Sequence, residues 1–171
     1  ILASPFLFEG HNFNDYNIPL ALMKTALFDE REFTDPYLIR VGQAMLIMAF
    51  ILVLMVAVCA LMSAFKRLKL KGKGILENPE YPALWILAGS LLISECIFCF
   101  KHPVACTQAF RYIAPVLIPA AVWSGSMMND EKNKIFSKIL MGGVIVFAIL
   151  VVLFYGPFAQ YSPPWEFLIK G

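Results

Sequence analysis

Four long apolar stretches set the strongest constraint on what this 171-residue chain can fold into. The hydrocarbon core of a bilayer is about 30 Å thick, and an α-helix needs about 20 residues to cross it. Stretches of this kind occupy residues 38–65, 82–100, 110–127 and 135–155. The sequence therefore predicts an all-α protein, a polytopic transmembrane helix bundle with about four spans.

The overall composition supports a membrane protein and excludes several other classes. Hydrophobic residues make up 60% of the chain and charged residues 15%, whereas about 25% of an ordinary soluble domain is charged. A water-soluble domain of this size could not bury so much apolar surface, so a soluble enzyme and a disordered chain are excluded. The net charge of +2 gives no reason to expect nucleic acid as a partner.

The first and third apolar stretches depart from a simple spanning helix. The first is longer than a bilayer requires, so we expect it to tilt or to project. The third is short and contains Pro115 and Pro119, which remove backbone donors and kink helices. Such breaks are tolerated at membrane depth only where protein or a polar cavity satisfies the freed groups. We therefore expect this stretch to lie inside the bundle.

The connecting loops predict the orientation of the bundle. Residues 66–73 contain five cations and no acid, and Lys132 and Lys134 lie in the second loop, with Lys138 just after it. Positively charged loops stay in the cytoplasm. Three segments then lie on the extracytoplasmic side: an N-terminal segment (residues 1–37), the connection 101–107, and an aromatic and proline-rich tail (residues 156–171). Residues 38–155 form the four-span bundle. The predicted location is the cell membrane, as a multi-pass protein.

The N-terminal segment contains one predicted helix. Asn17 can cap a helix that begins at Ile18-Pro19 and continues to Phe28. This helix is too short to span a bilayer, so we expect it to lie in the extracytoplasmic interface or to cover the bundle. The chain begins at Ile1 and has no secretory signal. We expect it to be the C-terminal part of a longer polytopic protein rather than a mature form whose signal was removed.

The four cysteines do not indicate a disulfide framework. Cys59, Cys96 and Cys99 lie within predicted spans, and only Cys106 is expected to be exposed. Cys96 and Cys99 are one helical turn apart, which is typical of packing residues. Metal binding by this pair is the weaker interpretation, because a tetrahedral site needs a second pair of ligands that the chain lacks.

The most informative polar residues lie around the second outer connection. Lys101, His102 and Arg111 fall within eleven residues at the predicted extracytoplasmic surface. A guanidinium that an apolar helix draws below the headgroups is unfavourable unless it is paired, and its planar fork suits a carboxylate or a phosphate. The alternative is an arginine that extends to lipid headgroups, as cations at helix ends usually do.

Residues 106–115, Cys-Thr-Gln-Ala-Phe-Arg-Tyr-Ile-Ala-Pro, resemble the late Arg-Tyr-x-x-Pro segment of bacterial GT-C membrane glycosyltransferases. These enzymes include relatives of the protein O-mannosyltransferases and the aminoarabinose transferases. Residues 12–19 and 27–30, with the helix between them, look like the extracytoplasmic region that precedes the last spans of such proteins. The resemblance covers most of the chain in order and topology.

The resemblance implies transfer of a sugar from a polyprenyl-phosphate donor to an acceptor at the outer membrane face. The catalytic base of the family is an Asp in a first outer loop to which no residue here corresponds. This chain would then bind the lipid phosphate through Arg111, with Tyr112, Lys101 and His102 nearby. Many relatives have an acid just before the Phe-Arg-Tyr element, where this chain has Gln108-Ala109.

Three further polar features are candidates for function. Glu95 is the only carboxylate well inside a predicted span, near Ser90 and Ser94, so it either marks a functional site or holds helices together. An outer acidic group is either a solvated turn or a site for a divalent cation; it consists of Asp29, Glu30, Glu32 and Asp35. His11, beside Asn12 and Asp15, could contact a sugar.

A second function class remains open at this stage. The chain could be a non-catalytic subunit of a membrane complex or a small transporter module, in which Glu95 and Arg111 line a polar path. The enzyme interpretation expects further spans and an acidic outer loop upstream, whereas this alternative does not.

Overall fold

The structure is a computed structural model, and it describes residues 18–28, 35–68, 80–102, 109–128 and 133–161. Every element in these ranges is a helix, so the all-α prediction is confirmed. In chain order the elements are α1 (Ile18–Phe28), α2 (Pro36–Leu68), α4 (Glu80–Lys101), the 3₁₀-helices η3 (Phe110–Tyr112) and η4 (Ala114–Val116), α5 (Leu117–Met128) and α6 (Lys134–Tyr161).

Three helices, rather than the four expected, are long and apolar enough to cross a bilayer. They are α2, α4 and α6, with candidate spans Pro36–Lys66, Glu80–Lys101 and Lys134–Pro157. The predicted third span, residues 110–127, instead forms two 3₁₀ turns followed by α5, which has 12 residues. At 1.5 Å per residue α5 is about 18 Å long, so alone it cannot cross a core of about 30 Å. The chain is a membrane protein whose third apolar stretch is broken.

The two prolines explain the break in the third stretch. Pro115 lies in η4, and Pro119 lies in the first turn of α5, where a missing N–H leaves no hydrogen bond unmade. The turns before α5 are held by short-range bonds, with Val116 N–H donating to Ile113 O at 2.8 Å. Only one face of α5 is buried, at Pro119, Trp123 and Met127. The stretch was expected to lie inside the bundle, and the structure packs one face of it there and leaves Leu117 and Ile118 exposed.

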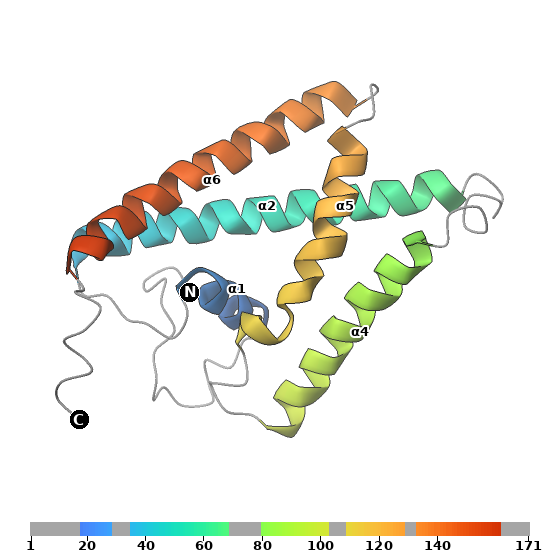
Figure 1. Cartoon of the computed structure of the whole chain (residues 1–171), viewed down its shortest axis with the longest axis horizontal. Coiled ribbons are helices and arrows are strands. Elements are labelled where there is room, and N and C mark those ends of the chain that lie inside the picture. Colours follow the sequence, from blue (N-terminus) through green and yellow to red (C-terminus); the bar gives the residue numbers. More distant parts are fainter. Residues whose placement is uncertain (1–17, 29–34, 69–79, 103–108, 129–132, 162–171) are drawn as a thin grey trace.

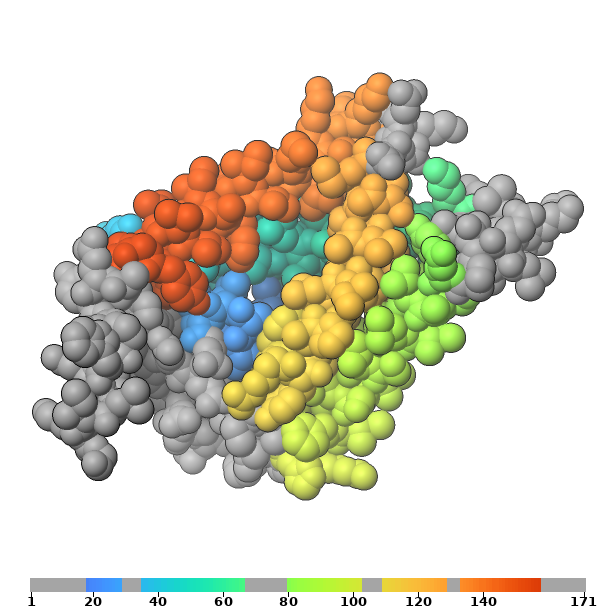
Figure 2. Space-filling view, in the orientation of Figure 1, coloured from blue at the N-terminus to red at the C-terminus, as the bar shows by residue number. Residues whose placement is uncertain are grey.

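Helix α2 runs along the long axis of the molecule, and α6 lies beside it, as Figure 1 shows. Helix α5 crosses in front of α2 and joins α6 to α4, and Figure 2 shows its side chains filling the space between those two helices. The last residues of α2 and the first residues of α4 lie toward the same end of the molecule as the last residues of α5 and the first residues of α6 (Figure 1). Helix α1 lies at the other end, which we call the α1 end.

Two groups of buried apolar residues hold the bundle together. The first lies where α2, α4, α5 and α6 meet and consists of Cys59, Ala60, Ala88, Trp123, Met127 and Leu140. The second lies at the α1 end, joins α1 to α2 and α6, and consists of Phe28, Leu38, Met45 and Phe154. Helix α1 therefore packs on the pair formed by α2 and α6, which is the covering position expected for it.

Helix α2 begins directly after Asp35, a member of the outer acidic group for which the sequence left a solvated turn and a cation site open. The Asp35 carboxylate accepts the backbone N–H of Tyr37 at 2.7 Å and that of Leu38 at 3.3 Å. This is the geometry of an N-cap followed by proline at the first helical position. Asp35 is thus committed to capping α2. The other three members of the predicted acidic group, Asp29, Glu30 and Glu32, lie outside the described residues.

Helices α4 and α5 are joined by aromatic and polar contacts. The rings of Trp85 and Trp123 have centroids 4.5 Å apart, and the hydroxyls of Tyr81 and Ser126 are 2.8 Å apart. Among the described residues, Trp123 Nε1 is a buried polar atom with no hydrogen-bond partner. Its ring therefore contributes packing rather than polar contacts to this interface.

A glycine sets the distance between α2 and α6. A Cβ built at Gly143 would lie 3.1 Å from Leu52 Cδ2, whereas one built at the adjacent Gly142 meets nothing within 4 Å. We expect Gly143→Val to cost about 1–3 kcal/mol of unfolding free energy through overpacking. Gly142→Val is the matched control, because both changes alter helix propensity equally. Unfolding in mixed micelles measures the difference, and equal stabilities of the two variants would contradict this close approach.

Candidate functional site

Helix η3 presents Arg111 and Tyr112 at the α1 end of the molecule. Both side chains are exposed, whereas the flanking residues Ala109 and Ile113 are 2% and 4% exposed. The turn is closed by backbone hydrogen bonds from Tyr112 to Ala109 at 3.2 Å and from Ile113 to Phe110 at 2.9 Å. The buried side chains of Ala109 and Ile113 thus anchor the turn to the bundle, and Arg111 and Tyr112 remain on its surface.

The turn is also held from a second helix. Thr25 of α1 accepts the N–H of Phe110 at 2.9 Å. The same hydroxyl lies 2.9 Å from the carbonyl oxygen of Ala21, to which it donates. Thr25 is 8% exposed and therefore buried. The buried face of α1 consists of Ala21, Thr25 and Phe28, so this face packs on the bundle and on η3.

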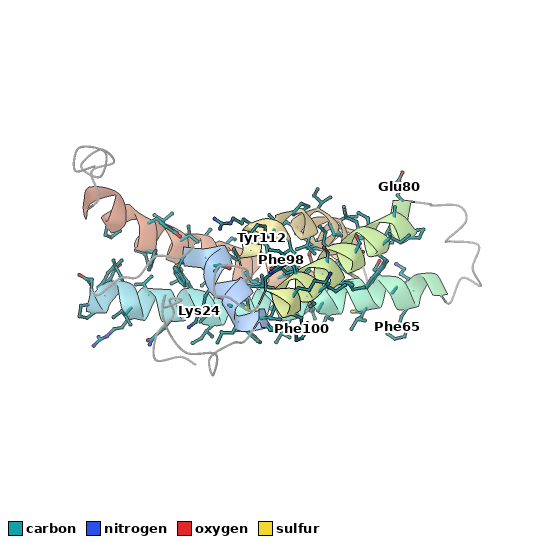
Figure 3. The ribbon with its side chains drawn as sticks, turned by 90° about the horizontal axis from the view of Figure 1, so that it is seen from below. Lys24, Phe65, Glu80, Phe98, Phe100 and Tyr112 are labelled. Atoms are coloured by element: carbon teal, nitrogen blue, oxygen red, sulfur yellow. The ribbon has the colours of Figure 1, made fainter. Side chains whose placement is uncertain are left out.

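Aromatic rings link η3 to the end of α4. The Arg111 guanidinium carbon lies 5.3 Å from the centre of the Tyr112 ring, within the range of a cation–π contact. Tyr112 meets Phe98 edge to face at 5.8 Å, and Phe98 lies 5.3 Å from the ring of His102. We call Phe98, His102, Arg111 and Tyr112 the aromatic–cation cluster. Figure 3 shows Phe98 and Tyr112 close together, with Phe65 and Glu80 far from them.

The structure thus brings together three of the four residues predicted to bind the lipid phosphate. The fourth, Lys101, is exposed in the last turn of α4, directly before His102 in the sequence. A cation at that position also stabilises the carbonyl end of the helix. Phe98 was not singled out from the sequence. Phe98 lies one helical turn before His102, and this spacing indicates a ring contact only weakly. An aromatic residue within a span ordinarily faces lipid.

Glu95 lies inside α4 and does not face the surface. Its side chain is 4% exposed, and its Oε1 accepts the thiol of Cys99 at 3.6 Å. Ala88, Glu95 and Cys99 are the buried residues of α4, so the carboxyl belongs to the face that packs on the protein. The polar partner that the structure gives it is one turn away in the same helix. A polar path that connects Glu95 with Arg111 therefore stays a prediction.

The described residues hold no group of three or more His, Cys, Asp or Glu side chains that could bind a metal ion. Cys59, Cys96 and Cys99 are free thiols, with Cys59 and Cys99 buried and Cys96 exposed. His11, which could contact a sugar, and Cys106, which was expected to be exposed, both lie outside the described residues. A divalent cation stays a prediction.

Comparison with protein-family models, with curated proteins and with solved structures gives no match for this chain. Its function is therefore argued from the chemistry of the aromatic–cation cluster and from the position of that cluster in the bundle.

Proposed function

We propose that this chain is the membrane part of a glycosyltransferase that moves a sugar from a polyprenyl-phosphate donor to an acceptor at the extracytoplasmic face. In this proposal the aromatic–cation cluster binds the phosphate of the lipid donor. The observation that supports it most is Arg111, whose exposed guanidinium is presented by a turn that two buried residues and a second helix hold in place.

The chemistry of the cluster suits a phosphate at a membrane surface. An arginine fork can give two parallel hydrogen bonds to a phosphate, which are shorter and stronger than bonds between neutral groups. The contact with the Tyr112 ring limits the orientations of the Arg111 guanidinium, and because the ring is uncharged it does not cancel the positive charge. Tyr112 and His102, both exposed, can add a hydroxyl and an imidazole to the same anion.

The surface of α4 suits the apolar part of such a lipid. Ile93, Ile97 and Phe100 follow one another at helical spacing and are 61%, 51% and 76% exposed. These residues form an apolar stripe over the last two turns of α4, on a face that points away from Phe98 and His102. The stripe suits contact with lipid chains in general, so the preference for a lipid-linked phosphate over a free one rests on the binding test.

Binding of decaprenyl phosphate to the purified chain in phosphatidylcholine nanodiscs tests the proposal. We expect saturable binding that Arg111→Ala removes and Arg40→Ala preserves. Arg40 is the matched control, because it is an exposed arginine on α2 outside the cluster. Phosphatidylglycerol and inorganic phosphate are the comparison ligands, and both should compete poorly. Equal binding of phosphatidylglycerol would make Arg111 a general headgroup anchor, and unchanged binding by Arg111→Ala would overturn the proposal.

A further inference from the structure

We infer that Thr25 is a positioning residue for the phosphate site, because its hydroxyl caps the turn that presents Arg111. The inference rests on the proposed function and extends it to a second helix. It assigns α1 a task beyond covering the bundle, which is to fix the direction in which the Arg111 guanidinium points.

The N–H of Phe110 is the first backbone donor of η3. Donors at the start of a helix have no partner within the helix and need one from outside. The residue in the cap position is Ala109, which makes no side-chain hydrogen bond to the turn. The partner comes instead from α1, where the Thr25 hydroxyl accepts the Phe110 N–H at 2.9 Å. A residue 85 positions away in the chain therefore performs the task of a local cap.

The hydroxyl is well suited to this task because it is itself fixed. A hydroxyl has one hydrogen to donate and two lone pairs to accept with. Thr25 directs its hydrogen at carbonyl oxygens of its own helix, Ala21 at 2.9 Å or Leu22 at 3.2 Å. A lone pair of the hydroxyl oxygen is then available to accept the Phe110 N–H of η3. Since the residue is 8% exposed, water has little access to replace this contact.

Helix α1 is in turn anchored on α6. The Tyr155 hydroxyl donates to the carbonyl oxygen of Leu27, and the rings of Phe28 and Phe154 have centroids 5.1 Å apart. The position of Arg111 is therefore linked to α6 through α1, by the Thr25 hydrogen bond to η3 and by the contacts of Leu27 and Phe28 with α6. Loss of the Thr25 hydroxyl breaks this connection at its last step and leaves the anchoring of α1 intact.

Thr25→Val tests the inference, since it keeps the shape of the side chain and removes the hydroxyl. We expect decaprenyl phosphate to bind roughly 5- to 30-fold more weakly, the factor that corresponds to one lost buried contact, and the Phe110 amide to exchange its hydrogen faster. Thr25→Ser, which keeps the hydroxyl, should restore both measurements. Ser124→Ala is the matched control, because the Ser124 hydroxyl bonds only to a carbonyl of its own helix among the contacts described, Ala120 at 2.8 Å. It should change neither.

The outcomes separate the inference from the proposed function. Wild-type affinity in Thr25→Val, together with loss of binding in Arg111→Ala, overturns the inference alone. Wild-type affinity in Arg111→Ala overturns the proposed function, and the exchange of the Phe110 amide still reports whether the Thr25 contact exists. If Thr25→Val does not insert, Thr25→Ala removes the same hydroxyl without adding bulk and is measured in the same way.

Discussion

In the longer enzyme to which we propose this chain belongs, Arg111→Lys is expected to weaken use of a polyprenyl-phosphate donor although it keeps the positive charge. A lysine ammonium is a point charge on a flexible stem, whereas the guanidinium offers two parallel donors. Arg111→Ala removes the contact completely, and a hydrogen bond to a charged group contributes about 1.5–3 kcal/mol. If the contact is made in the transition state, that loss corresponds to roughly a 10- to 150-fold lower kcat/KM for the lipid donor.

The lysine variant distinguishes directional recognition from simple attraction. A headgroup anchor requires only charge, so it would leave Arg111→Lys with normal donor kinetics. We expect Arg111→Lys to lie between the wild type and Arg111→Ala, with all three inserted equally in the membrane. Steady-state kinetics at a range of donor concentrations provide the measurement. Identical values for the lysine variant and the wild type would reject bidentate binding of phosphate.

Phe154→Ala is expected to have the largest effect on stability. The Phe154 side chain is fully buried, 0% exposed, in the group of residues that joins α1 to α2 and α6. Phe→Ala changes in protein cores cost about 3–5 kcal/mol. We expect about 3 kcal/mol here, because lipid can replace part of what the ring loses. The variant should also bind lipid phosphate more weakly, since Phe154 contacts Phe28 of α1.

A phenylalanine on the outside of the bundle provides the control for this change. Phe65 of α2 is 62% exposed, so Phe65→Ala removes an equal ring without leaving a cavity. Equilibrium unfolding in mixed micelles, followed by tryptophan fluorescence, compares the two variants. Equal losses of unfolding free energy would show that α1 does not depend on the packing of Phe154.

The helices were predictable because their cause is local. Bilayer thickness fixes how many apolar residues a span needs, and a proline in a helix interior removes a backbone hydrogen bond and favours a break or a kink. The sequence therefore predicted α2, α4 and α6 closely, and it placed the disruption of the third stretch at Pro115 and Pro119. It did not predict that α5 would be too short to span a bilayer. The length of a helix after a break depends on which hydrogen bonds the backbone groups of the preceding turns make.

The site was only partly predictable because its contacts are long-range. Lys101, His102 and Arg111 were visible as a group of polar residues, because they are near one another in the chain. The Thr25 contact joins residues 85 positions apart, and no local pattern of α1 marks that hydroxyl as different from a surface threonine. Asp35 is a second case, because the sequence left a solvated turn and a cation site open for the acidic group, and the structure shows that its fourth member is an N-cap.

Photocrosslinking tests the central claim, that the aromatic–cation cluster binds a lipid-linked phosphate, most directly. The probe is a decaprenyl phosphate with a diazirine on the first isoprene unit, incorporated with the chain in phosphatidylcholine nanodiscs and located by peptide mapping. The account predicts crosslinks to the end of α4 and to η3, above all at Phe98 and Tyr112, and their loss in Arg111→Ala. Crosslinks confined to α2 and α6, or unchanged in Arg111→Ala, would contradict it.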